Sequence, residues 1–331
     1  MTSAPSPKPL TPLAQALALW LGDARPAAPR ACAPSEAIGR VLAEAVRAPE
    51  NAPLRPRARR AGFAVAASDT VGASPYAPAP CLAPPPFVAA GDPLPEGCDA
   101  VLPADALSDG PIPEIQAEVA PGTDVRRAGA EARAGETLIA AGRRLRASDA
   151  AALTALGVGT VSVRAPLVRL DGAAWLAPVV TALGGEVVSG EADLVLAVAP
   201  GDAAYPVDGL ALRPGETTRL ARDADGVPVA LLPAVESDAL GAALALLPPA
   251  LAALAGAEPP APQPARLAAP LTSTVGLAEI ALLARDGDAY APLGVGDLTL
   301  ATFARADAFA LLAPESEGHA AGETVAVWRL P

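Results

Sequence analysis

The chain has 331 residues, 52% of them hydrophobic and 3% aromatic, which excludes wholesale disorder and predicts two or three domains with cores of Ala, Leu and Val. Its net charge of -12 argues against nonspecific nucleic-acid binding, because an acidic surface repels phosphate. The 39 prolines and 29 glycines predict many turns and short elements rather than long helices.

The first 50 residues predict two short helices. Thr11 is a candidate N-cap with Pro12 at the first helical position, and apolar residues recur at helical spacing up to Gly22. A second helix is predicted to start at Ser35 and to bury Leu42 on its apolar face.

Residues 60–165 predict short strands followed by one helix. Proline-rich turns separate the expected strands, which fall at 63–67, 87–89, 101–103 and 115–119. The helix is predicted to be capped by Ser148 and to stop at Gly157.

Residues 166–331 predict an α/β unit, a linker and a strand-rich module. Strands of the α/β unit are expected at 168–170, 186–188, 194–198 and 229–232. Helices are expected near 173–183 and 237–247, and the second is predicted to end at Pro248 and Pro249. The composition of residues 256–265 predicts a linker, and the strand-rich module follows it.

The remaining composition favours an intracellular protein. Cys32, Cys81 and Cys98 lie far apart without metal-ligand spacing, so neither a metal site nor a disulfide framework is expected. The N-terminal sequence MTSAPSPKPLTP has no apolar region of the kind found in signal peptides. No membrane-spanning segment is expected, so we predict a cytoplasmic protein without membrane or nucleic-acid partners.

Three sequence blocks point to a known family. Residues 92–101 read DPLPEGCDAV, residues 35–53 read SEAIGRVLAEAVRAPENAP, and residues 322–330 read GETVAVWRL. The first resembles the PLPEGADAVV signature of the molybdopterin molybdenumtransferase family, which includes the enzymatic part of gephyrin. Residues 35–53 resemble the opening block of the same family and residues 322–330 its closing block. Residues 122–163 resemble a block between these two.

This resemblance implies a multidomain α/β plus β fold. Residues 1–165 would form mostly β N-terminal domains, with an inserted β subdomain at about 46–135. Residues 166–255 would form a shortened α/β molybdopterin-binding-like domain, and residues 266–331 a C-terminal β-barrel. The resemblance also implies a homodimer with the site between protomers.

The family's chemistry is the transfer of molybdate onto adenylylated molybdopterin, for which the resemblance implies Mg²⁺ and acidic residues. The expected acids and lysine are replaced in this chain. The aspartate of NSAMDGYAV falls on Ala61, the acids of TGDEL on Ala173 and Ala174, and the lysine of RPGKP on Glu216. The threonine of TGAPLPEG falls on Ala90, and the glutamate of GEDI falls on Ala130, next to Glu131.

Because glycine, proline and apolar positions persist while charged site residues are absent, the pattern favours a member that has lost the transferase reaction. No metal-ligand set is predicted. The alternative is an altered active site, for which Asp171 and Asp202 are the candidate catalytic residues.

Arginines gather where the family's catalytic loop would lie. Such a cluster can hold a phosphate of molybdopterin or adenylylated molybdopterin through bidentate hydrogen bonds. A solubility feature or a dimer contact would explain the same cluster. The candidate cofactor-binding residues are Arg57, Arg59, Arg60, Gly62, Gly91, Asp92, Arg126 and Arg127.

Three functions remain open at this point. The chain would be a pterin carrier or delivery factor, an active transferase with an altered site, or a regulatory partner of a true transferase. Its expected partners are a second copy of itself and a molybdoenzyme or another protein of molybdenum cofactor biosynthesis.

Overall fold

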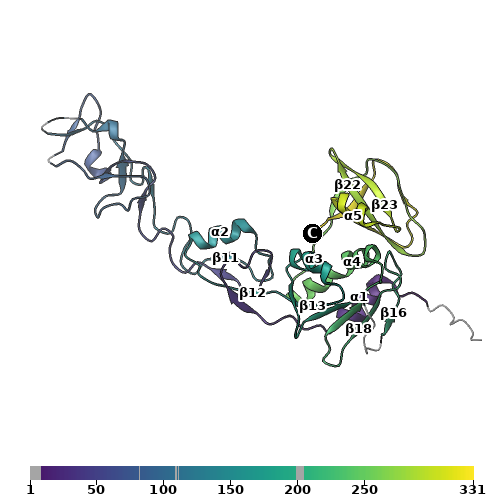
Figure 1. Ribbon diagram of the computed structural model, residues 1–331. Coiled ribbons are helices and arrows are strands. Elements are labelled where there is room, and N and C mark those ends of the chain that lie inside the picture. The colour runs from purple at the N-terminus through teal and green to yellow at the C-terminus, as the bar shows by residue number, and fades with distance from the viewer. Residues whose placement is uncertain (1–8, 82, 109, 111, 199–204) are drawn as a thin grey trace, which may run out of the picture. The chain divides into compact units, whose positions relative to one another are not determined.

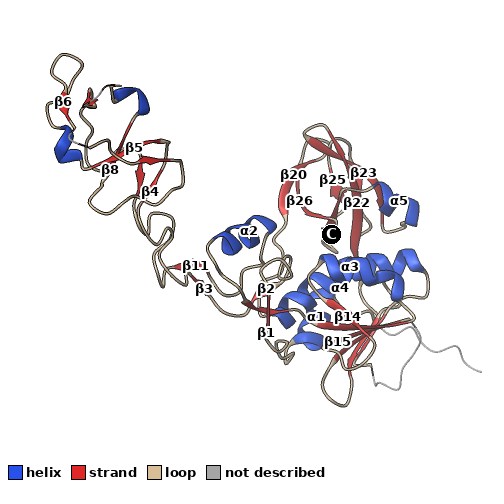
Figure 2. Cartoon of the chain, turned by 60° about the vertical axis from the view of Figure 1, so that its left-hand side comes forward, coloured by secondary structure: helices blue, strands red, loops and turns tan. Residues whose placement is uncertain are grey.

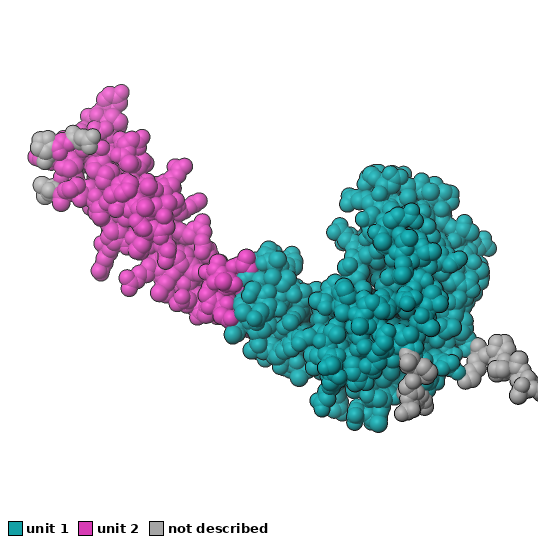
Figure 3. All heavy atoms as spheres, in the orientation of Figure 1, with its two compact units in different colours: residues 1–44, 141–150, 160–331 teal, residues 45–140, 151–159 magenta. Residues whose placement is uncertain are grey.

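The computed structural model describes residues 9–81, 83–108, 110, 112–198 and 205–331. These residues form two compact units, which Figure 3 colours separately. Unit 1 comprises residues 1–44, 141–150 and 160–331, and unit 2 comprises residues 45–140 and 151–159. Short strands in several small sheets dominate both units, with few helices (Figure 2), in agreement with the expected mostly β, multidomain chain.

Unit 2 is built from short antiparallel strands. Its largest sheet has the order β7-β5-β8, and three two-stranded ladders pair β10 with β4, β11 with β3, and β6 with β9. The strands are β3 (Val46–Arg47), β4 (Arg57–Ala58), β5 (Gly62–Val65), β6 (Ala79–Pro80), β7 (Phe87–Val88), β8 (Ala100–Leu102), β9 (Glu114–Ile115), β10 (Val125–Arg126) and β11 (Thr137–Ile139). Two 3₁₀ turns accompany them, η1 (Ala67–Thr70) and η2 (Ala104–Ala106). The predicted strand at 115–119 is too long, because β9 ends at Ile115.

One part of unit 1 is a six-stranded sheet with helices (Figure 1). Its order is β14-β13-β15-β19-β18-β16, in which the first four strands are parallel to one another and β18 pairs antiparallel with both β19 and β16. The strands are β13 (Leu167–Asp171), β14 (Glu186–Val188), β15 (Leu194–Ala197), β16 (Val207–Asp208), β18 (Arg219–Arg222) and β19 (Pro228–Leu231). The helices are α1 (Leu13–Leu21), η3 (Ala174–Leu176), α3 (Ala177–Ala182) and α4 (Glu236–Ala255).

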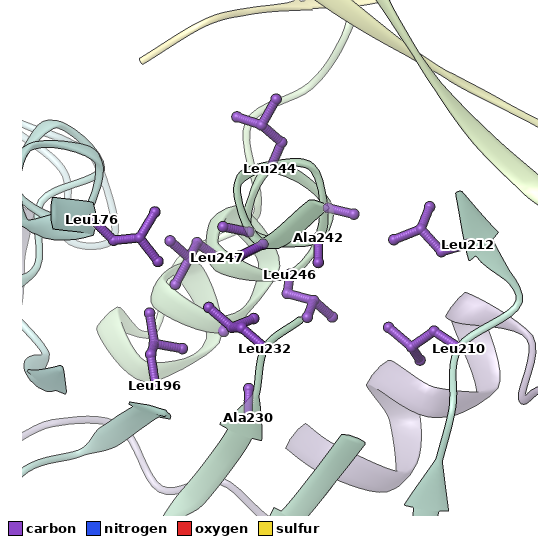
Figure 4. Close-up of a cluster of buried hydrophobic side chains, with 14 of the residues drawn as sticks. Leu176, Leu196, Leu210, Leu212, Ala230, Leu232, Ala242, Leu244, Leu246 and Leu247 are labelled. Atoms are coloured by element: carbon purple, nitrogen blue, oxygen red, sulfur yellow. The ribbon is translucent and has the colours of Figure 1, made fainter. Parts of the chain in front are cut away.

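Helix α4 supplies much of the core of unit 1. Leu246 and Leu247 of α4 belong to one buried cluster with Leu196 and Leu232 (Figure 4). Among the described residues, α4 is the one helix long and apolar enough to cross a membrane, and 72% of its most apolar window is buried inside the protein. Core packing therefore accounts for the apolar length of α4.

The prediction that this helix ends at Pro248 and Pro249 is wrong, because both prolines lie inside α4. An interior proline costs about 3 kcal/mol through its missing N–H and its clash with the preceding turn. Beyond the prolines, Leu251 and Leu254 are 1% and 2% exposed. Each fully buried leucine contributes about 1.5–3 kcal/mol, which favours continuing the helix.

The rest of unit 1 consists of three sheets and a short helix. The first sheet has the strand order β17-β22-β24-β26-β20, and β23 also pairs with β22. The second sheet pairs β21 with β25, and the third has the order β1-β12-β2. The strands are β1 (Arg30–Cys32), β2 (Val41–Leu42), β12 (Val161–Arg164), β17 (Leu212–Arg213), β20 (Gln263–Arg266), β21 (Leu271–Thr272), β22 (Ala278–Asp286), β23 (Ala289–Val295), β24 (Ala308–Leu312), β25 (Gly318–His319) and β26 (Thr324–Arg329). The helix is α5 (Leu300–Arg305).

Three predicted helix starts differ from the structure. The N-cap of α1 is Pro12 and not the predicted Thr11. The Thr11 backbone N–H donates to the Gly209 carbonyl at 3.0 Å, outside the helix. The helix predicted from Ser35 is a series of turns, and Leu42 lies in strand β2. Ser148 lies inside α2 (Ala147–Ala155), where Asp149 accepts from the Arg146 backbone at 2.9 Å.

Candidate functional site

Unit 2 contains a surface pocket of about 690 Å³, which we call the arginine pocket. All residues that line it belong to unit 2. They are Glu50, Asn51, Ala52, Pro53, Leu54, Arg57, Ala58, Arg59, Gly91, Arg126, Glu131, Ala155, Leu156 and Gly157. The structure therefore brings four of the predicted binding residues to one cavity, namely Arg57, Arg59, Gly91 and Arg126.

The β4–β10 ladder sets the positions of the arginines. Arg57 and Arg126 are direct antiparallel partners in this ladder. Side chains of direct partners project from the same face of a sheet, with Cβ atoms about 4.5–5.5 Å apart. Arg59 follows two residues later, and its backbone N–H donates to the Asp124 carbonyl at 2.7 Å. The ladder thus gathers guanidinium groups that the sequence separates by almost 70 residues.

The loop that carries the DPLPEGCDAV motif flanks β4 on its other side. The Ala58 N–H donates to the Asp92 carbonyl at 2.9 Å, and the Gly91 N–H donates to the Ala58 carbonyl at 2.8 Å. Arg57 Nη1 donates to the Gly91 carbonyl at 3.3 Å. Gly91 has a φ of +92°, which a residue with a side chain rarely adopts. This glycine therefore allows the loop to turn beside Arg57.

Two carboxylates accompany the arginines in the pocket. Glu131 forms an ion pair with Arg126, and their side chains are 47% and 45% exposed. Glu50 also lines the pocket and is exposed. Glu131 lies one position from the place of the GEDI glutamate, whereas no motif indicated Glu50 as a binding residue. The segments that carry the two acids meet through non-local backbone hydrogen bonds.

Other predicted binding residues have structural contacts instead of a place in the pocket lining. Gly62 is buried in β5, where an added Cβ would lie 2.3 Å from the Leu102 carbonyl oxygen. The Asp92 carboxylate accepts from the Ala89 backbone at 2.8 Å and closes a turn. Arg127 lies against Gly122, and Arg60 is an exposed residue outside the lining.

The two candidate catalytic acids receive no support as a pair. Asp171 ends β13, and its carboxylate accepts from Arg169 Nε at 3.1 Å on the protein surface. Asp202 lies outside the described residues.

Apolar side chains lie near the carboxyl ends of two parallel strands, beside Asp171 at the end of β13. Ligands of open α/β sheets bind at this edge. After β13 come Ala173, Ala174 and Trp175, and after β19 comes Val235. Trp175 is 40% exposed and Val235 is 55% exposed. This edge therefore presents an aromatic ring and an aliphatic side chain, and two alanines, Ala173 and Ala174, stand where the sequence resemblance implies acids.

Another polar group combines Arg213 of β17 and Asp238 of α4 with Glu216 and Asp297. Arg213 Nε donates to the Glu216 carboxylate at 2.8 Å. Burial raises the pKa of Asp238 above its ordinary value, and the charges of Glu216 and Asp297 raise it further. Within the described ranges, no three His, Cys, Asp or Glu side chains come together in a way that would hold a metal ion. Among the described residues, the side chains present therefore do not fit the Mg²⁺ site that the sequence resemblance implies.

Comparisons with known proteins identify similar sequences and folds. Residues 11–157 match the family model described as MoeA N-terminal region (domain I and II). The chain is similar to the molybdopterin biosynthesis MoeA protein of Pyrococcus horikoshii, with a TM-score of 0.80 and 23% identity over 98% of this chain and 100% of that chain. It is also similar to a molybdenum cofactor biosynthesis protein of Pyrococcus furiosus, with a TM-score of 0.64 and 19% identity over 96% and 99% of the two chains. At these identities, the structural similarities show a shared fold.

Proposed function

We propose that this chain belongs to the molybdopterin molybdenumtransferase family, whose MoeA proteins it resembles in fold and in residues 11–157, and that it binds a molybdopterin without transferring molybdenum to it. It would act in molybdenum cofactor biosynthesis as a carrier or delivery factor. The observation that carries this proposal is the arginine pocket, which keeps a cationic binding surface on a scaffold whose expected catalytic acids are alanines.

The loss of chemistry is argued from the side chains present. Ala61, Ala173 and Ala174 can neither ligate a metal nor move a proton, and Glu216 replaces a cation with an anion. Since the donor set does not fit Mg²⁺, we derive no step through a metal. The residues of this chain would bind and orient the pterin without cleaving its AMP–phosphate bond.

The binding role is argued from charge and volume. The volume of the arginine pocket is within the range of about 300–1,000 Å³ that is usual for small-molecule sites. In the described part of the chain, Arg57 and Arg59 have no carboxylate partner, whereas Arg126 is paired with Glu131. Guanidinium groups bind phosphate oxygens in a bidentate geometry. Arg57 and Arg59 would therefore hold the phosphate of the ligand.

Two further features belong to the same proposal. We propose a cytoplasmic homodimer that serves a molybdoenzyme or another protein of molybdenum cofactor biosynthesis. We also propose that the sheet with α1, α3 and α4 corresponds to a shortened molybdopterin-binding domain and that the C-terminal strands correspond to the family's β-barrel.

A second candidate function is an active transferase with an altered site. The raised pKa of Asp238, in a group with Glu216 and Asp297, favours this alternative over a purely regulatory role. In that case Asp238→Asn would abolish AMP release from adenylylated molybdopterin. The binding proposal expects no AMP release from the wild type.

The test of the binding proposal is an affinity measurement on the full chain. Molybdopterin is titrated against wild type and against the double variant Arg57→Ala/Arg59→Ala. Each lost charge-assisted contact costs about 1.5–3 kcal/mol, so binding should weaken at least about a hundredfold. The control Arg266→Ala/Arg329→Ala removes the same charge from exposed positions of β20 and β26. Equal affinities of wild type and the pocket variant, or no binding by wild type, would contradict the proposal.

A further inference from the structure

The arginine pocket carries charges of both signs. Arg126 and Glu131 neutralise each other in an ion pair. Arg57 and Arg59 remain on the cationic side, and Glu50 remains as a carboxylate. Within the described part of the chain, the Glu50 side chain makes no ion pair or hydrogen bond. A ligand that used the whole pocket would therefore present both an anionic group and hydrogen-bond donors.

The backbone that carries Glu50 is fixed on both sides. Ala48 exchanges backbone hydrogen bonds with residues 135 and 136, at 2.9 Å each. The Ala52 N–H donates to the Ala132 carbonyl at 2.8 Å, and the Ala52 carbonyl accepts from Glu131 at 2.8 Å. Between them, Asn51 Oδ1 accepts from the Ala134 N–H at 3.0 Å. The segment 48–52 that carries Glu50 is therefore hydrogen-bonded to residues 131–136 through Ala48, Asn51 and Ala52, which fixes the backbone of Glu50 at the pocket.

An ionised carboxylate is acceptor-only, and its two oxygens suit two parallel N–H donors. The pyrimidinone ring of a pterin presents such a pair, a ring N–H beside an exocyclic amino group. Guanine carries the same donor pair. Adenine presents one amino donor beside a ring nitrogen acceptor, which a carboxylate repels. A carboxylate at a ring-binding site thus discriminates between these two classes of ring.

We infer that Glu50 binds the donor edge of the pterin ring while Arg57 and Arg59 bind its phosphate. The inference rests on the proposed function, because it assigns the second half of the same pocket. It makes the arginine pocket specific for phosphorylated ligands with a guanine-like ring edge. Glu50 is then a specificity-determining residue, and the arginines supply affinity for any phosphate.

Three simple probes test this assignment, namely GMP, AMP and inorganic phosphate. Their affinities are measured by calorimetry on the full chain. Wild type should prefer GMP to AMP by about tenfold or more, since a site built to accept N–H donors discriminates against a ring that lacks them. Glu50→Gln should remove this preference while leaving inorganic phosphate affinity unchanged or slightly tighter. The control Glu96→Gln, at an exposed position of unit 2 outside the pocket, should keep the preference.

The outcomes separate this inference from the proposed function. If Arg57→Ala/Arg59→Ala abolishes molybdopterin binding but wild type binds GMP and AMP equally, the inference about Glu50 is wrong and the pocket remains the binding site. A preference for GMP that survives Glu50→Gln also overturns it. If wild type binds neither molybdopterin nor any probe, the proposed function fails together with the inference.

Discussion

At the scale of single residues, the central feature is the placement of Arg57 opposite Arg126. Like charges directly across a ladder destabilise a sheet by about 0.2–1 kcal/mol. The ion pair between Glu131 and Arg126 offsets part of this cost. The sequence revealed both arginines but not their pairing, because strands 68 residues apart meet through backbone hydrogen bonds that local patterns do not encode.

The ion pair itself leads to a residue-scale prediction. Glu131→Gln frees Arg126 for the ligand, so inorganic phosphate should bind more tightly. An exposed ion pair is worth up to about 1 kcal/mol, which corresponds to a gain of up to about fivefold. Calorimetric titration with phosphate at low ionic strength measures the change. Weaker binding in Glu131→Gln would show that Glu131 supports the site and does not compete with the ligand.

Gly62 allows a structural role to be separated from a ligand role. In Gly62→Ala the new Cβ would lie 2.3 Å from the Leu102 carbonyl, so β5 and β8 must move apart. We expect a loss of about 1–3 kcal/mol in the free energy of unfolding, as for other overpacked sites. Urea denaturation measures this loss. Unchanged stability together with weaker molybdopterin binding would make Gly62 a binding residue after all.

At the scale of elements, helix α2 shows how the start of a helix is stabilised. The Asp149 carboxylate accepts from the Arg146 N–H and pairs with the Arg143 and Arg146 side chains. The hydrogen bond from the Arg146 side chain contributes most to holding the pKa of Asp149 well below its ordinary range. The predicted capping residue, Ser148, lies one position further into the helix.

Asp149→Asn should therefore destabilise the chain, by about 1 kcal/mol at neutral pH, in the range of a lost helix cap. Because the folded-state pKa is depressed, the contribution of Asp149 is complete above the unfolded-state value of about 4. It is lost as pH falls from there through the folded-state pKa, so the gap between wild type and variant should narrow below about pH 4. Thermal unfolding at several pH values measures the gap, with Ser148→Ala as the control expected to change little. A gap that widens in acid would contradict this assignment.

Sequence patterns predicted elements well where local and tertiary preferences agree. The strands β13, β15 and β19 are parallel, β15 and β19 are largely buried, and the positions of all three were predicted within a residue or two. Prediction failed where distant contacts decide. Gly39, with a φ of +80°, interrupts the helix predicted from Ser35, and Leu42 pairs with Val163 in a sheet.

At the scale of the whole molecule, the proposal separates the fold, which is MoeA-like, from the transferase chemistry, which we propose to be lost. The fold is MoeA-like at 23% identity, with a TM-score of 0.80. Glycines, prolines and apolar residues hold its turns and cores, as the burial of α4 and the turn at Gly91 illustrate. The site could be predicted only in part, because the arginines stand out in the sequence and Glu131 lies beside a family motif, whereas Glu50 belongs to no recognisable pattern.

The proposed homodimer gives a prediction at this scale. Light scattering of the purified chain should give about twice the chain mass of 32.7 kDa. The physical reason is that a core rich in Ala, with few aromatics, buries little apolar area per residue and gains from burial by association. A monodisperse monomer at micromolar concentration would contradict the dimer without affecting the arginine pocket.

The most direct test of the account is to incubate the full chain with adenylylated molybdopterin, molybdate and Mg²⁺. Mass spectrometry then measures the ligand retained on the protein and the AMP released into solution. We predict that the protein retains intact ligand in about equimolar amount, that Arg57→Ala/Arg59→Ala retains none, and that AMP stays at the level of the protein-free control. Multiple turnovers of AMP would contradict the loss of transferase chemistry, and wild-type protein that retains no ligand would contradict the binding role.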